Sequence, residues 1–279
     1  MWEALQIHGT DVPATASDPD VMVEARVPSS ALADDLAVVF PDEEVSDSRQ
    51  DASLGALVHA ALDRKARLIP HAMDPVVAEY YRRLRAKIIQ QQEKSPFRSL
   101  VVTSANPQEG KTVTVLNLGL SFSMLPSYKV LVVDGDMRKG TLGHWLGVEH
   151  NRPGLSNLID GSAQLEDVIL KSDEIPMHFM VRGSSLVPDL LSSQLDLHFQ
   201  RIAEQFDLVL VDTPPVNLIA DVQLLAASCD AVLIVARAFA TTRKALEKAV
   251  QELLPFRVIG TVLNAGTEEH YGYRGYGTY

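Results

Sequence analysis

The sequence is poor in cysteine, in aromatic residues and in long apolar runs. Cys229 is the only cysteine among 279 residues, which excludes a disulfide within one chain and argues against a metal cluster held by several cysteines. A lone thiol is typical of a reducing compartment, so we expect a cytoplasmic protein. No apolar run approaches the roughly 20 residues that cross a bilayer. The N-terminus lacks the basic and apolar regions of a secretory signal, so none is expected.

The sequence also lacks an excess of basic residues. Of its 36 acidic and 25 basic residues, twelve acids and two bases lie within residues 1–51, which leaves 24 acids and 23 bases for the rest. Of the net charge of −11, −10 therefore belongs to the N-terminal part, and the remainder, at −1, is close to neutral. Such a chain has no broad basic field, so no nucleic-acid partner is expected.

Composition divides the chain into three parts. Residues 1–70 are rich in Pro, Ser and Asp and show no sustained periodicity, which predicts an acidic, flexible extension. Its first residues, "MWEALQ", fit either a short docking helix or a frayed end. Residues 71–266 read as one folded domain, and residues 267–279 as a flexible tail. Four tyrosines alternate with glycines in this tail: Tyr271, Tyr273, Tyr276 and Tyr279.

The domain alternates short apolar runs with helical patterns. The runs are β-branched and apolar on both faces, as in strands of a buried parallel sheet, and they lie at 99–103, 129–133, 206–211, 230–236 and 257–264. Helices are predicted over 74–94, 110–125, 192–204, 220–228 and 241–254. The connection from Leu142 to Phe179 is longer and less regular. This alternation predicts an α/β fold with a doubly wound, mostly parallel sheet flanked by helices.

The stretch "SLVVTSANPQEGKTVTVLNLGLSF" carries the strongest motif. An apolar run leads into a turn-rich loop, and Gly110-Lys111-Thr112 then opens a helix, which is the context of a phosphate-binding P-loop. Backbone amides would bind phosphate oxygens, Lys111 would neutralise them, and the Thr112 hydroxyl would ligate Mg²⁺. Ala105 replaces the first glycine of the consensus, and a coincidental helix N-terminus is the alternative. The predicted nucleotide contacts are Asn106, Pro107, Gln108, Glu109, Gly110, Lys111, Thr112 and Val113.

Three acidic residues follow two other predicted strands. Asp134 and Asp136 end "KVLVVDGDMRKG", and because they lie two residues apart on a strand, both carboxylates are expected on one side. Asp212 ends "FDLVLVDTPPV". Ligands of such sheets bind beyond the carboxyl ends of the strands, so the acids and the P-loop are predicted at one edge. Single acids at strand ends are often helix caps, but three beside a P-loop favour a catalytic site.

The three motifs "SANPQEGKT", "VLVVDGDMRKG" and "LVLVDTPPV" together resemble the Walker A, Walker A′ and Walker B motifs of the bacterial tyrosine kinases. That family belongs with the MinD- and ParA-type P-loop ATPases. The resemblance covers residues 74–279 and includes "EYYRRLR", which matches a family oligomerisation motif as Glu79, Arg82 and Arg85. It implies a protein-tyrosine autokinase that works with an inner-membrane polysaccharide co-polymerase and a cognate phosphatase in exopolysaccharide or capsule export.

The resemblance also implies roles for individual residues. ATP and Mg²⁺ would be the cofactors, with Thr112, Asp134 and Asp212 around the metal ion. Lys111, Asp134, Asp136 and Asp212 would be catalytic, with Asp136 orienting or deprotonating the attacking tyrosine. Asn264 would contact the adenine. Gln108 departs from the family, in which this position is often glycine.

Two other functions compete with the kinase. A MinD- or ParA-type ATPase switch would carry a signature lysine five residues before Lys111, where this chain has Asn106, and MinD relatives end in an amphipathic helix rather than a Gly-Tyr tail. A nucleotide-sensing scaffold without kinase activity is the other alternative. Neither accounts for the tyrosines as readily as a kinase that phosphorylates them.

Glu79, Arg82 and Arg85 share one broad stripe of a predicted helix. Their spacing alone favours a solvated charged face, whereas the resemblance favours a contact with a neighbouring subunit in a ring. The tail also has two interpretations: a low-complexity interaction segment, or the phosphoacceptor cluster of the kinase. The resemblance favours the second.

Overall fold

The structure is a computed structural model that describes residues 22–23, 75–148, 151–171, 176–185 and 195–265. The tyrosine tail and the N-terminal extension, apart from Met22–Val23, lie outside these residues, so the flexibility expected of both stays a prediction. Within the described part, no helix is both long and apolar enough to span a membrane.

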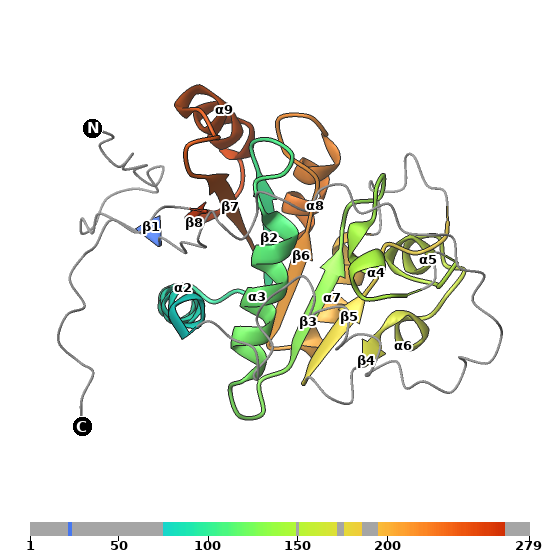
Figure 1. The fold of residues 1–279 in the computed structure, drawn as a ribbon. Helices are drawn as coiled ribbons and strands as arrows, with labels where there is room; N and C mark the ends of the chain where they lie inside the picture. The colour runs from blue at the N-terminus through green and yellow to red at the C-terminus, as the bar shows by residue number, and fades with distance from the viewer. Residues whose placement is uncertain (1–21, 24–74, 149–150, 172–175, 186–194, 266–279) are drawn as a thin grey trace.

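One sheet organises the described residues (Figure 1). Its strands follow the order β1-β8-β7-β2-β6-β3-β5-β4, and every neighbouring pair is parallel except the antiparallel pair β4–β5. The strands are β1 (Met22–Val23), β2 (Ser99–Ser104), β3 (Val130–Asp134), β4 (Leu170–Lys171), β5 (Met177–Met180), β6 (Leu208–Asp212), β7 (Ala231–Arg237) and β8 (Val258–Asn264). The predicted doubly wound, mostly parallel sheet is therefore confirmed.

Helices cover both faces of the sheet. They are α2 (Pro75–Lys94), α3 (Lys111–Ser123), α4 (Thr141–Trp145), α5 (Leu155–Ile159), α6 (Leu165–Val168), α7 (Leu195–Gln205), α8 (Asp221–Ser228) and α9 (Arg243–Leu253). Apolar side chains of α2, α3 and α4 form one core with one face of the sheet, and those of α5, α7, α8 and α9 form a second core with the other face. Every residue of β2, β3 and β6 is buried, which explains their continuous apolar sequence.

The irregular connection contains structure that its sequence pattern does not predict. It holds α4, α5 and α6, the two-residue strand β4, and β5, which pairs in parallel with β3. β5 reads "MHFM", too short and too rich in long side chains to stand out as a strand. Its pairing is decided by the neighbouring β3 rather than by its own propensity.

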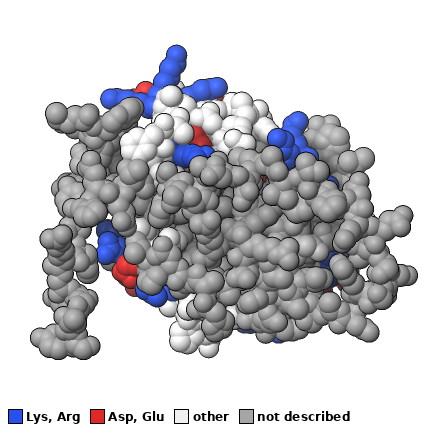
Figure 2. Space-filling model, viewed as in Figure 1, with Lys and Arg blue, Asp and Glu red and all other residues white. Residues whose placement is uncertain are grey.

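The surface carries separate groups of charge. On the face shown in Figure 2, described basic side chains gather at the top of the view, in the region of α9, and other charged groups are scattered. The sequence of α9, "RKALEKAVQEL", supplies such basic residues.

Candidate nucleotide-binding site

The P-loop connects β2 to α3, as its sequence predicts. Gly110 precedes the first residue of α3 and has a left-handed backbone, with φ of 91°. A Cβ atom at this position would lie 1.9 Å from the Nδ2 atom of Asn264. Only glycine therefore fits, because both the backbone angle and the contact exclude a side chain.

Gln108 is a strained residue in the same loop. Its φ is 61°, in the left-handed region that a glycine enters at little cost. A glycine at this position would adopt the same angle without strain. The side chain of Gln108 is exposed, so it does not pack in return for this strain.

Glu109 fixes the shape of the loop from inside. Its carboxylate is buried and accepts hydrogen bonds from the backbone N–H of Asn106 at 3.1 Å, the Nδ2 of Asn106 at 3.0 Å and the Oγ1 of Thr241 at 2.6 Å. Thr241 Oγ1 accepts in turn from the backbone N–H of Arg237 at 2.7 Å, and the Arg237 guanidinium donates to the Gln108 carbonyl at 3.3 Å. The loop after β7 thus braces the P-loop.

Thr241 and Arg237 were not predicted from the sequence. Glu109 lies 132 residues from Thr241, and no motif marks the pair. The one hint in the sequence was Glu109 itself, an acidic residue inside a phosphate-binding loop. A buried carboxylate needs hydrogen-bond donors, so partners from elsewhere in the chain could have been expected.

Asn264 lies beneath the P-loop. Its Nδ2 donates to the Glu109 carbonyl at 3.0 Å, and its Oδ1 accepts from the backbone N–H of Ala265 at 2.9 Å. The buried side chain therefore supports the loop backbone. The predicted contact with adenine stays a prediction. We call Glu109, Thr241, Arg237 and Asn264 the braced end of the site.

The two motif aspartates of the sheet lie side by side. Asp134 is the last residue of β3, Asp212 is the last residue of β6, and the two are register partners. Thr112 at the start of α3 donates its hydroxyl to Asp212 Oδ2 at 2.6 Å. The Asp134 carboxylate accepts from the backbone N–H groups of Asp136 at 3.1 Å and Leu142 at 2.9 Å. We call Thr112, Asp134 and Asp212 the acid end.

Burial makes the acid end costly to charge. Burial, together with the nearby Asp212 carboxylate, raises the pKa of Asp134 to about 8. Burial also raises the pKa of Asp212 to about 6, against the opposing effects of the Thr112 hydrogen bond and the Lys111 charge. Burial lowers the pKa of Lys111, while Asp212, Glu109 and Asp136 oppose that change. A bound cation would relieve the repulsion between the two carboxylates.

The acid end suits a magnesium ion that also binds phosphate. Asp212 Oδ1 is buried without a hydrogen-bond partner, so an acceptor is available beside the Thr112 hydroxyl. Among the described residues, no group of three or more His, Cys, Asp or Glu side chains forms a metal-binding cluster. Mg²⁺ requires octahedral oxygen coordination and usually takes part of it from water and substrate phosphates. The residues fit such a shared site.

Asp136 is positioned by a turn rather than by a strand. The expectation from strand spacing does not hold for it, because β3 ends at Asp134. Asp136 Oδ1 accepts from the backbone N–H groups of Arg138 at 3.1 Å and Lys139 at 2.9 Å, which holds the carboxylate at the rim. Arg138 forms an ion pair with Asp221 at 3.2 Å and ties this turn to α8.

The predicted oligomerisation stripe on α2 divides into two parts. Glu79 and Arg82 are half-exposed and form an ion pair at 3.2 Å within the helix. Arg85 instead donates to the Ser121 carbonyl of α3. Glu79 and Arg82 are therefore open to a partner, whereas Arg85 already contributes to packing within its own chain.

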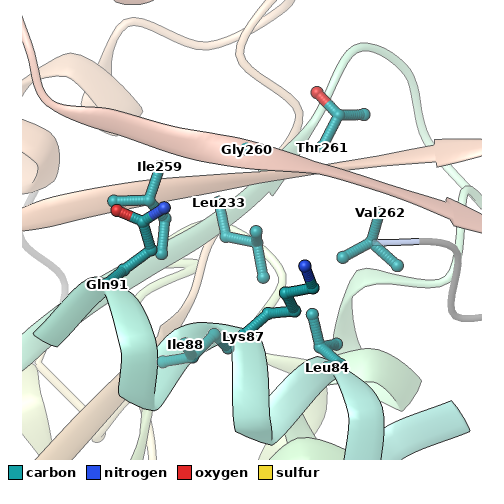
Figure 3. A pocket seen from close by; sticks show the side chains of 9 residues that line it. All are labelled: Leu84, Lys87, Ile88, Gln91, Leu233, Ile259, Gly260, Thr261 and Val262. Atoms are coloured by element: carbon teal, nitrogen blue, oxygen red, sulfur yellow. The ribbon is translucent and has the colours of Figure 1, made fainter. Parts of the chain in front are cut away.

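A small apolar groove lies elsewhere, between α2 and the strands β7 and β8. Figure 3 shows Leu84 and Lys87 on the helix side and Val262 and Ile259 on the strand side. None of the residues that line it belongs to the P-loop or the acid end. Most of its lining is apolar, and the groove contains neither the amides of the P-loop nor Lys111, so we do not assign the nucleotide to it.

The fold and the site together define a P-loop nucleotide-binding protein. The profile of the family described as "AAA domain" matches residues 101–254. Tyrosine-protein kinase YwqD of Bacillus subtilis is 31% identical over 209 residues, which cover 71% of this chain and 86% of the relative. Tyrosine-protein kinase CpsD of Streptococcus pneumoniae is 31% identical over 195 residues, 67% of this chain and 83% of the relative.

Solved structures agree with the sequence relatives. The kinase domain of the Escherichia coli tyrosine kinase ETK superposes with a TM-score of 0.63 at 27% identity and covers 71% of this chain and 81% of that domain. The chain belongs to the bacterial tyrosine kinase family.

Proposed function

We propose that the protein is an ATP-dependent tyrosine kinase that phosphorylates the tyrosines of its own C-terminal tail. Family membership supports the activity. The structural observation that carries the proposal is the convergence of the P-loop with the buried pair Asp134–Asp212, joined by the Thr112–Asp212 hydrogen bond. The alternative ATPase switch would use the same phosphate contacts, so the tail distinguishes the two.

The residues divide the chemistry between them. The loop amides and Lys111 would bind and neutralise the phosphates of ATP, and Thr112, Asp134 and Asp212 would hold Mg²⁺. When bound, Mg²⁺ neutralises charge on the phosphate oxygens. A tyrosine oxygen forms the new bond to the γ-phosphorus, the bond to the bridging oxygen of ADP breaks, and Asp136 accepts the phenolic proton. A phenol is protonated at neutral pH, so an acceptor at the rim is required.

The last described strand, β8, ends at the edge of the sheet where this reaction would take place. β8 runs parallel to β7 and ends at Asn264, beneath the P-loop. Tyr271 lies seven residues further on, which allows about 23 Å of extended chain, and Tyr279 has about 50 Å. Lengths of this order would let the tail tyrosines approach the site of the same or a neighbouring subunit.

Phosphorylation between subunits of a ring is the arrangement that we favour. The exposed Glu79 and Arg82 would contact the next copy, and each phosphate added to the tail contributes about −1.5 to −2 charges beside an acidic site. Repulsion would then release the tail and loosen the ring.

The kinase would work with two partners. A membrane-bound co-polymerase would recruit it to the inner face of the membrane, and a phosphatase would remove the phosphates. The process regulated in this way would be the export of exopolysaccharide or capsule.

The ring can be tested without disturbing the fold. The exposed Glu79–Arg82 pair contributes at most about 1 kcal/mol to folding, so Glu79→Ala/Arg82→Ala should remain folded yet shift the assembly to monomers in light scattering. Arg85→Ala is the matched comparison, because it also removes a contact with α3 and should lower the melting temperature. Unchanged assembly of the double variant would count against the stripe as an interface.

The activity is tested with labelled ATP and mass spectrometry. Wild-type protein expressed with its membrane partner should carry phosphotyrosine on the tail, and Lys111→Met should carry none. Lys87→Met, an exposed lysine on α2, is the control that should behave as wild type. Release of free phosphate without labelled protein would favour the ATPase switch, and nucleotide binding without turnover would favour the scaffold.

A further inference from the structure

Phe239 is an exposed aromatic residue in an unfavourable backbone conformation. Its exposed fraction of 82% is the highest among the large hydrophobic residues of the described chain. Its φ is 60°, which is rare for a bulky side chain. A residue that is neither packed nor relaxed makes no visible contribution to folding, and such outliers often mark ligand sites.

The turn that carries Phe239 is fixed against the P-loop. The Ala238 N–H donates to the Asn264 carbonyl at 2.8 Å, and the Thr241 N–H donates to the Arg237 carbonyl at 2.9 Å. Thr241 and Arg237 also bond to Glu109 and to the Gln108 carbonyl, as described above. The phenyl ring is therefore presented from a rigid turn and not from a loose loop.

The strained residues of the molecule gather on this side of the site. Four described residues other than glycine have positive φ, and three of them are Gln108, Phe239 and Ala265. These three lie just beyond the ends of β2, β7 and β8, which are neighbours in the sheet. Such clustering is expected where a ligand offsets the strain.

The sheet order shows which part of a nucleotide would lie there. Asp212 and Asp134, which would face the terminal phosphate, are the last residues of β6 and β3. Both strands lie on the same side of β2, the strand that leads into the P-loop. Suppose that the phosphates of a nucleotide lie on the P-loop and that the terminal phosphate lies at these two aspartates. The base must then extend in the opposite direction along the sheet edge. That direction leads over the ends of β7 and β8, where Phe239 stands.

We propose that Phe239 is an aromatic platform on which the adenine base of the bound nucleotide stacks. The contact rests on the nucleotide site of the proposed function but not on phosphoryl transfer. Every base offers a π-face to an aromatic ring, and loss of one stacking partner weakens binding by roughly tenfold. The platform would add affinity for the base without contributing to phosphate binding.

Calorimetric titration with ADP and with inorganic tripolyphosphate, both with Mg²⁺, separates the two parts of the ligand. Phe239→Ala should weaken ADP binding about tenfold and leave tripolyphosphate binding unchanged. Phe239→Trp should retain ADP affinity. Phe239→Gly removes the ring and also relaxes the strained backbone. If the ring provides the contact, this variant should lose as much ADP affinity as Phe239→Ala does. Leu254→Ala, an exposed apolar residue beyond α9, should change neither titration.

The proposal is overturned if Phe239→Ala binds ADP as wild type does, or if it loses ADP and tripolyphosphate equally. A changed state of assembly with unchanged ADP affinity would assign Phe239 to a protein contact instead and would likewise overturn it. Because calorimetry measures binding without turnover, the role of Phe239 can be confirmed even if no phosphotyrosine forms. The absence of phosphotyrosine would then refute the kinase proposal and leave the stacking proposal standing.

Discussion

The two ends of the site are built on opposite principles. At the braced end, Glu109 receives three hydrogen bonds, and both polar atoms of the Asn264 side chain have partners. At the acid end, two buried carboxylates lie on adjacent strands, and one oxygen of Asp212 has no partner. One end is complete without a ligand, and the other is incomplete.

This difference indicates how the site works. A satisfied network is rigid, so the braced end sets the shape of the P-loop before a nucleotide arrives. Unpaired buried charge is costly, so the acid end gains stability when Mg²⁺ and phosphate bind. Positioning is thus separated from charge neutralisation, and mutations at the two ends should differ in their dependence on pH and on magnesium.

The largest effect is expected where the braced end meets the loop. Gly110→Ala places a Cβ atom 1.9 Å from Asn264 Nδ2 and adds strain at a φ of 91°, so nucleotide affinity should fall by at least about 100-fold in calorimetry. Gly161→Ala is the control, because Gly161 is also left-handed, with φ of 76°, but has open space around it. Equal losses in both variants would mean that backbone strain alone is responsible.

A smaller effect is expected from the centre of the brace. Glu109→Ala leaves the donors of Asn106 and Thr241 without their acceptor, so the free energy of unfolding should fall by about 1–3 kcal/mol. The loss should not depend on magnesium. Glu252→Ala, which removes an exposed carboxylate bound by Gln223, should stay within about 0.5 kcal/mol of wild type.

The acid end should respond to pH in the opposite sense to an ordinary ion pair. The raised pKa of Asp212, about 6, means that the folded protein holds a proton which the unfolded chain releases near pH 4. The contribution of Asp212 to stability without ligand is therefore greatest below about pH 4 and is lost as pH rises through 6, and Asp134 extends this decline toward pH 8.

Asp212→Asn removes one of these charges and can still bond to Thr112. It should raise the free energy of unfolding by about 2 kcal/mol at pH 8, by about half as much at pH 5 and by little below pH 4, in denaturant titrations without magnesium or nucleotide. Stabilisation by Mg²⁺ and nucleotide should be lost. A variant less stable than wild type at pH 8 would show that the charge of Asp212 is already compensated.

The smallest effect concerns the exposed loop residue. Gln108→Gly removes strain at a φ of 61° but adds freedom to the unfolded chain, so the two effects partly cancel and stability should change by less than about 1 kcal/mol. Gln108→Val should lose stability, because a β-branched residue tolerates this angle poorly. Thermal melting of both variants checks the order Gly, Gln, Val.

The same contrast explains what the sequence could predict. Apolar runs predicted β2, β3, β6, β7 and β8. The meeting of Asp134 and Asp212 at the ends of β3 and β6 was predicted as well, because the ends of parallel strands share one edge of the sheet. The brace was missed because Glu109 and Thr241 meet only after the chain folds. Phe239 was missed because an exposed phenylalanine in a turn has no sequence signature. β5 was missed because its pairing depends on β3.

The most direct test of the account asks whether one copy phosphorylates another. Lys111→Met with an intact tail is mixed with a copy that keeps Lys111 but has phenylalanine at Tyr271, Tyr273, Tyr276 and Tyr279, together with ATP, Mg²⁺ and the membrane partner. Mass spectrometry should find phosphotyrosine on the tail of the Lys111→Met copy. Absence of phosphotyrosine from that tail, while wild-type protein labels its own, would contradict transfer between subunits, and absence from both would contradict the kinase.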